Sequence, residues 1–309
     1  MDCFKAKQGV CQIYPISALN VIRILGKSPP YYKMDSHGQE SFFAVCPCCE
    51  NPIQIVGLFK ETKEAGRKPY GKHFKGSVPH LANYCEEDYY NCPYSKPQRK
   101  TAKGKKRSDD STVARAMLHL LMEQFDRIIY ILAKDIDMYI SQDTAEDMLR
   151  SYIRNEGWRF NDASLHNLPW KFAEAERGLR LFGRLIRRNS VLEQALREKC
   201  PEVELRPTDE AHSDGSFLQV CSHDNKFVNL RYLLYNHQIK MDDTGERIEE
   251  TIVFRVYRGE APNIETILEK EISIRTDYFM NLISSQKTMY RNQKLLQIAQ
   301  ENLKPFIKG

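Results

Sequence analysis

Apolar residues recur at every third or fourth position over several long stretches of this chain, which is the spacing of a helix with one buried face. The longest such stretch follows the polar helix-start residues 109–112 and runs to about Ile140. Gly26 and the pair Pro29-Pro30 end a shorter one near the N-terminus. We expect helices at residues 16–26, 112–140, 144–155, 169–188, 263–271 and 276–303.

Alternating apolar and polar residues predict strands in two other regions. Runs at 41–45 and 53–58 flank a cysteine-rich turn, and runs at 217–221, 227–239 and 251–257 follow later, the last two separated by the turn sequence Asp242-Asp243-Thr244-Gly245. The expected fold class is α+β, with an N-terminal zinc-ribbon-like module, a mainly helical middle, and a small antiparallel sheet plus C-terminal helices. We divide the chain into a module at 1–95, a basic flexible linker at 96–110, a helical domain at 111–200 and an α+β domain at 201–309.

Length and composition place the chain among ordinary globular proteins. It has 309 residues, of which 41% are hydrophobic, enough to fill the cores of two modest domains. No apolar run approaches the roughly 18 residues needed to cross a bilayer, and the first residues lack the apolar core of a secretion signal. Nine cysteines, three of them crowded at 46, 48 and 49, fit metal binding in a reducing compartment better than a disulfide framework. We therefore expect a cytoplasmic protein of a bacterial or mobile-element type, with no membrane partner.

A candidate zinc site lies in the first third of the chain. Cys46 and Cys49 form a Cys-x-x-Cys pair stiffened by Pro47, which lets two thiolates reach one Zn²⁺ from a single turn. We favour His73 and Cys92 as the other ligands, because His73 follows a Gly-Lys turn and Cys92 precedes a proline as Cys46 does. Three residues could substitute for members of this set: Cys48, His80 and Cys85. The zinc should be structural, since no nearby Glu is placed as a metalloprotease base; the alternative is a group of free, buried thiols.

Positive charge is concentrated beside this motif. Residues 60–107 contain thirteen Lys and Arg against five Asp and Glu, a local charge of +8 in a chain whose net charge is +5. Such a concentration of positive charge is typical of nucleic-acid binding. Within the linker, the residues expected to contact phosphates are Lys96, Arg99, Lys100, Lys103, Lys105, Lys106 and Arg107. The alternative is a solvated tether without a ligand.

The predicted helix at 169–188 carries a second basic feature. At 100° per residue, five arginines fall within an arc of roughly 100°, opposite an apolar face that includes Phe172, Leu179 and Ile186. The stripe consists of Arg177, Arg180, Arg184, Arg187 and Arg188. Guanidinium groups at successive turns could follow a phosphate backbone, although charged stripes on solvated helices are also common.

A third motif lies between residues 223 and 237. The order His223-Asp224, Asn229 and His237 resembles the metal finger of His-Asn-His endonucleases, in which one His activates water while the last His and an acidic residue hold a divalent metal. The resemblance covers about fifteen residues, and only five separate His223 from Asn229 where the family places a longer strand and loop. Alternating apolar residues also suit a simple strand. One further polar group could form a metal cluster or could belong to a solvated loop. It comprises Asp209, Glu210, His212 and Asp214.

Together these features predict a nucleic-acid-binding protein without catalysis, in which zinc holds a basic module in shape. Four tyrosines of the module could stack on bases or fill its core: Tyr84, Tyr89, Tyr90 and Tyr94. The two alternatives are a metal-dependent nuclease of the His-Asn-His type and an assembly protein whose arginines bind an acidic protein surface.

Overall fold

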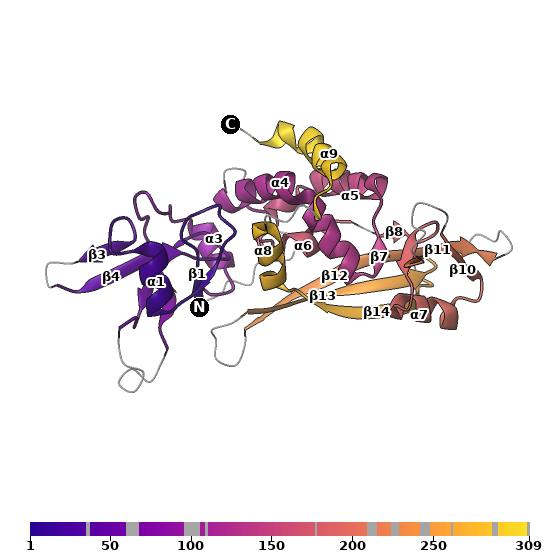
Figure 1. The fold of residues 1–309 in the computed structure, drawn as a ribbon, viewed down its shortest axis with the longest axis horizontal. Helices are drawn as coiled ribbons and strands as arrows, with labels where there is room; N and C mark the ends of the chain where they lie inside the picture. The colour runs from indigo at the N-terminus through magenta and orange to yellow at the C-terminus, as the bar shows by residue number, and fades with distance from the viewer. Residues whose placement is uncertain are drawn as a thin grey trace.

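The computed structural model is an elongated mixed α+β protein, with an N-terminal module at one end and a larger body at the other (Figure 1). It describes residues 1–34, 38–59, 68–95, 106–108, 111–176, 178–208, 215–223, 229–241, 248–260, 262–285 and 290–307. No helix within these ranges is both long and apolar enough to cross a membrane.

The N-terminal module is built on a four-stranded antiparallel sheet in the order β3-β4-β5-β6. Its elements are β1 (Cys3–Phe4), β2 (Tyr14–Pro15), α1 (Ala18–Leu25), β3 (Tyr32–Met34), β4 (Glu40–Val45), β5 (Pro52–Val56), β6 (Tyr70–His73) and α3 (Glu86–Asn91). Ser17 caps α1 by accepting a hydrogen bond from the Asn20 amide, and Gly26 ends the helix at a φ of 68°. The apolar side of α1 and one face of the sheet share a core that includes Val21 and Phe42.

The body combines helices with two further four-stranded antiparallel sheets, in the orders β10-β11-β9-β7 and β14-β13-β12-β8. The helices are α4 (Thr112–Asp135), α5 (Gln142–Arg154), α6 (Leu168–Glu174), α7 (Val191–Lys199), α8 (Thr276–Ser284) and α9 (Gln293–Leu303), with 3₁₀ turns at Gly157–Arg159 and Lys304–Phe306. The strands are β7 (Met138–Tyr139), β8 (Leu179–Arg180), β9 (Leu185–Arg187), β10 (Val203–Pro207), β11 (Phe217–Ser222), β12 (Leu230–Met241), β13 (Ile248–Arg258) and β14 (Glu265–Ser273). The long β12–β13 pair bulges at Asn236, whose φ is 57°, and one end of it reaches toward the module (Figure 1).

One hydrophobic core runs through the whole body, from Val113 on α4 to Leu303 on α9. Strands from both sides of residue 200 also pair directly, since β9 lies beside β11 and β8 beside β12. The boundary expected between 111–200 and 201–309 therefore does not separate two cores.

The predicted helix at 169–188 is wrong beyond Glu174. Gly178 and Gly183 adopt φ values of 123° and 75°, which end helical geometry, and the residues around them form β8 and β9 instead. The helix predicted at 263–271 is likewise wrong, because residues from Glu265 onward belong to strand β14, and the predicted helix at 276–303 is divided into α8 and α9. The turn predicted at 242–245 lies outside the described residues.

Candidate functional site

Four side chains from three parts of the module meet at one point. Cys46 and Cys49 lie on the turn between β4 and β5, His73 ends β6, and Cys92 follows α3. The Cys46 and Cys92 Sγ atoms are 3.8 Å apart, Cys49 Sγ lies 3.3 Å from His73 Nε2, and one ligand atom from each residue lies within 4.8 Å of the others. A tetrahedral centre with metal–sulfur bonds of about 2.3 Å has sulfur–sulfur edges of about 3.8 Å. The four residues therefore fit a single metal ion.

The electrostatics of the cluster also suit a cation. Burial raises the pKa of Cys49 and of Cys92 well above the usual value. Burial acts on Cys46 in the same direction, but hydrogen bonds from the other two thiols outweigh it and hold the pKa of Cys46 well below the usual value. One thiolate is thus stabilised by its neighbours, and a metal would extend that state to all three cysteines, because the thiolate is the ligating form.

The turn that carries the first two cysteines is held by hydrogen bonds. The Cys46 amide donates to the Asn51 carbonyl at 2.8 Å, and the Asn51 side chain donates to the Cys49 sulfur at 3.4 Å and accepts from the Cys85 amide at 2.6 Å. Cys85 therefore supports the turn through its backbone. It does not belong to the group of four ligand atoms, nor do Cys48 and His80, the latter exposed on a turn with a φ of 62°.

Two linker residues expected to contact phosphates are engaged within the protein. Arg107 is buried, and its guanidinium donates to Asp88 on α3 at 2.9 Å and to the carbonyls of Phe160, Asn161 and Ala163 in the body. Lys106 pairs with Glu156 at 2.7 Å. The structure therefore leaves Arg107 little to offer a phosphate, because it is buried and four of the five N–H donors of its guanidinium already bond to internal acceptors. Lys96, Arg99, Lys100, Lys103 and Lys105 lie outside the described residues.

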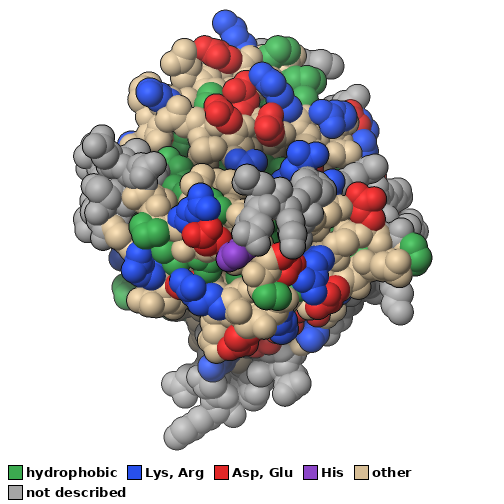
Figure 2. Space-filling model, turned by 90° about the vertical axis from the view of Figure 1, so that its right-hand side faces the viewer, with side chains coloured by type: hydrophobic (Ala, Val, Ile, Leu, Met, Phe, Trp, Pro, Cys, Tyr) green, Lys and Arg blue, Asp and Glu red, His purple; other side chains and the backbone are tan. Residues whose placement is uncertain are grey.

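The arginine stripe does not form, because the helix that would carry it ends before the first arginine. Arg184 donates to the Thr144 hydroxyl, the Arg187 guanidinium stacks 5.3 Å from the Phe217 ring, and Arg180 and Arg188 are exposed on a short strand and a turn. On the end of the body seen in Figure 2, acidic and basic side chains alternate and neither sign gathers into a patch. Arg177 lies outside the described residues.

The residues that resemble a His-Asn-His site are not brought together. Asn229 precedes β12 and donates to Glu260, whereas His237 lies eight residues further along that strand. At about 3.3 Å per residue, roughly 26 Å separates the two, far more than a shared metal allows. His223 directly follows a different strand, β11. Asp224, and the group Asp209, Glu210, His212 and Asp214, lie outside the described residues.

His237 instead belongs to a buried charged cluster that the sequence did not reveal. Its Nε2 lies 2.8 Å from Glu250 on β13, its Nδ1 lies 3.7 Å from Asp162, and its backbone amide donates to Glu174 on α6 at 3.2 Å. The Lys171 ammonium bonds to both Asp162 and Glu174. Only His237 stood out in the sequence, because the other members come from separate segments and match no local motif.

Neighbouring charges shift the protonation of this cluster. Burial raises the pKa of Asp162, but the neighbouring His237 and the Lys171 ammonium outweigh it, so the net pKa lies below its usual range. Burial lowers the pKa of His237, yet the nearby carboxylates of Asp162 and Glu250 raise the net value. The cluster therefore favours the charged form of both partners.

A second surface feature lies on the module sheet, on the face opposite α1. The register places Lys33, Phe43 and Lys72 on this face, beside the Gln54 amide, which donates to Ser41. The Phe74 ring packs edge-on against Phe43 at 5.3 Å and is 38% exposed. A groove of about 530 Å³ opens here, lined by Pro29, Pro30, Tyr32, Lys33, Phe43, Phe74, Ser77, Val78, Pro79 and His80. We call this surface the aromatic–basic face.

The tyrosines of the module differ in how far they take part in its core. Tyr89 is buried and packs against the rings of His73 and Tyr90, which favours the core role for it over base stacking. Tyr94 packs on the module core, and Tyr84 contacts the edge of Tyr89.

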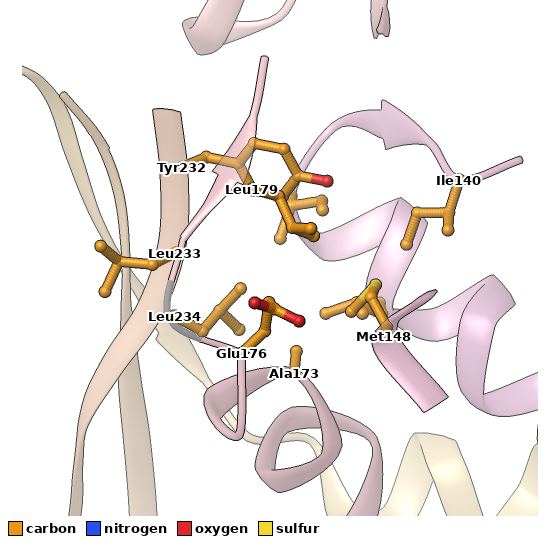
Figure 3. Close-up of a pocket in the computed structure, with 10 residues that line it drawn as sticks. Ile140, Met148, Ala173, Glu176, Leu179, Tyr232, Leu233 and Leu234 are labelled. Atoms are coloured by element: carbon orange, nitrogen blue, oxygen red, sulfur yellow. The ribbon is translucent and has the colours of Figure 1, made fainter. Parts of the chain in front are cut away.

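An apolar cavity beneath β12 is too small for a ligand. Figure 3 shows Leu234, Met148 and Ala173 around it, with the carboxylate of Glu176 directed inward. Its volume is about 10 Å³, room for at most one water.

Comparison with known proteins adds no relative: no family model, no curated protein and no solved structure matches this chain.

Proposed function

We propose that the protein binds single-stranded nucleic acid through the aromatic–basic face, and that Cys46, Cys49, His73 and Cys92 hold a structural Zn²⁺ that keeps this face in shape. The module would then be zinc-ribbon-like, with Cys46 and Cys49 of its β4–β5 turn on the metal. Three thiolates and one imidazole form a closed tetrahedral set that leaves no position for water, as in structural zinc sites.

The observation that carries the binding proposal is one exposed ring, that of Phe74, in a groove with exposed lysines in and beside it. Bases stack on aromatic side chains, and lysines beside them neutralise the backbone. Phe74 offers an exposed ring, while Lys33, Lys72 and Lys75 are exposed nearby on β3, β6 and the residues that follow β6. The groove is wide enough for a single base, since sites for small ligands begin at about 300 Å³.

The zinc centre is coupled directly to this face. His73 lies between Lys72 on the face and Phe74 in the groove, so a metal bound to His73 fixes the strand end that presents both. Loss of the ion would release these side chains together with the turn.

The test is binding of a fluorescent oligothymidine or oligouridine across a salt series, by anisotropy. Phe74→Ala should weaken binding about 5- to 100-fold, since stacking contributes about 1–3 kcal/mol per base. Lys72→Ala should lower the slope of log K against log salt by about 0.7. Phe59→Ala and Arg23→Ala are matched controls: Phe59 is exposed but packs on Phe42, and Arg23 lies on α1, both away from the aromatic–basic face. Equal losses in the controls, or no binding at low salt, would refute the proposal.

A further inference from the structure

The charged cluster around His237 contains side chains that could ligate a metal ion and a carboxylate that would hold one of these ligands in place. Glu250 accepts at 2.8 Å from Nε2, and Nδ1 faces Asp162 and Glu174, so the neutral imidazole with its proton on Nε2 would direct a lone pair at these carboxylates. Histidines that ligate metals usually donate their other ring N–H to a carboxylate in this way. The 3.7 Å between Nδ1 and Asp162 Oδ2 is too long for a hydrogen bond and close to the separation of two ligands on one ion.

A divalent ion would balance the charge of the cluster once the imidazole is neutral. Asp162, Glu174 and Glu250 carry three negative charges, and Lys171 supplies one positive charge. One negative charge is left over when His237 is protonated, and two are left over when it is neutral, the form that ligates a metal. Solvent screens part of this charge, since the Glu250, Glu174 and Asp162 side chains are 10%, 22% and 41% exposed.

An independent observation points to a missing ligand beside these carboxylates. A space of about 20 Å³ between module and body is lined by Asp162 and Glu250 and also by Asn161, although Glu174 and His237 do not line it. Asn161 is 8% exposed, and neither its Oδ1 nor its Nδ2 has a hydrogen-bond partner among the described residues. Buried amides are normally satisfied, so this side chain indicates a polar partner beside Asp162 that the protein atoms do not supply, either a water or an ion with its water.

We propose that Asp162, Glu174 and Nδ1 of His237 bind a divalent cation of the Mn²⁺ type, that Glu250 orients the imidazole, and that Asn161 hydrogen-bonds a water on the ion. Carboxylates suit hard ions and the single imidazole suits later transition metals, and Mn²⁺ accepts both. The Lys171 ammonium contacts Asp162 and Glu174 at the same place, so it competes with the ion and moves aside when the ion binds.

The competition by Lys171 gives the sharpest test, with Mn²⁺ itself as the probe. Protein first loaded with Zn²⁺, so that the cysteine site is filled, should bind one Mn²⁺ by electron paramagnetic resonance or calorimetry. Glu174→Gln and Glu250→Gln should each weaken this binding at least about 10-fold. Glu265→Gln is the matched control, because Glu265 pairs with Arg258 at the surface and should leave Mn²⁺ affinity unchanged.

Lys171→Met should tighten Mn²⁺ binding at least about 10-fold, because it removes the competing cation. If this variant is too unstable without metal, Mn²⁺ should raise its melting temperature by more than it raises that of the wild type. Absence of Mn²⁺ binding at millimolar concentration, equal binding by Glu174→Gln, or an Mn²⁺ affinity of Lys171→Met no higher than that of the wild type would overturn the proposal.

Discussion

Replacing Arg107 should destabilise the protein far more than its place beside a basic segment suggests. Arg107→Met removes a guanidinium that is only 4% exposed and leaves the buried Asp88 carboxylate and three carbonyl oxygens without their donor. Breaking a buried ion pair from one side costs about 3–5 kcal/mol. The Ser111 hydroxyl, 3.4 Å from Asp88, offers only weak compensation. We expect a loss of about 4 kcal/mol in the free energy of unfolding.

A double-mutant cycle with Asp88→Asn separates the pair from its surroundings. In the double variant the leftover carboxylate charge is gone, so its loss should be about 2 kcal/mol smaller than the sum of the single losses. Urea denaturation followed by tryptophan fluorescence reports the body, because Trp158 and Trp170 both lie there. Release of zinc to a coloured chelator reports the module.

Both readouts should shift together in Arg107→Met, since the guanidinium joins α3 to the body. Lys106→Met is the control, because Lys106 forms an exposed pair that contributes less than about 1 kcal/mol. A loss below about 1 kcal/mol in Arg107→Met, or an effect confined to nucleic-acid affinity, would refute the reasoning and restore the phosphate-binding role expected from the sequence.

Three further outcomes are expected. Elemental analysis should find one zinc per chain in Cys85→Ser and none in Cys49→Ser, because Cys49 belongs to the proposed ligand set and Cys85 does not. Retention of zinc by Cys49→Ser would contradict the assignment. Burial and then the charge of Lys5 lower the pKa of His166 to about 3, below the unfolded value near 6.5, so stability is full above pH 6.5 and falls as the pH drops toward 3. The free energy of unfolding should fall by about 2 kcal/mol between pH 7 and pH 5. In His166→Gln, measured by urea denaturation, this fall should be smaller by the same amount. An equal fall in the variant and the wild type would exclude His166 as the cause. Gly157→Ala should cost about 3 kcal/mol or more in thermal unfolding, since a Cβ there would lie 2.2 Å from the buried ring of Tyr152, and a wild-type melting temperature would show that the ring can move.

The sequence predicted those parts of the protein that local chemistry determines. The helix beginning near residue 112 was visible because its buried side recurs at helical spacing, and Ser111 caps it by accepting from the Ala114 amide. The grouping of Cys46 and Cys49 with His73 and Cys92 was also predicted, since a Cys-x-x-Cys turn limits what can complete a tetrahedron. The identity of the metal stays a prediction.

The sequence failed where two structures share one pattern or where distant segments meet. Residues 169–188 place arginines at helical spacing, yet Gly178 and Gly183 favour backbone conformations that a helix cannot use. Asp162 and Glu250 are 88 positions apart, and no periodicity indicates that they meet at His237. Arg107 was expected to contact phosphates, because its burial depends on carbonyls some fifty residues away that no local pattern indicates.

The internal anchoring of Arg107 has a consequence for handling the protein. The basic segment 96–105 contains five lysines and arginines, and all but Lys96, which precedes a proline, are sites for trypsin. The residues that flank it are anchored, the buried Ser95 on the module and Arg107 on the body. A single nick between them would cut the polypeptide but leave the guanidinium, its carbonyl acceptors and Asp88 in place. Two fragments would then run apart on a denaturing gel while still migrating as one particle through a sizing column.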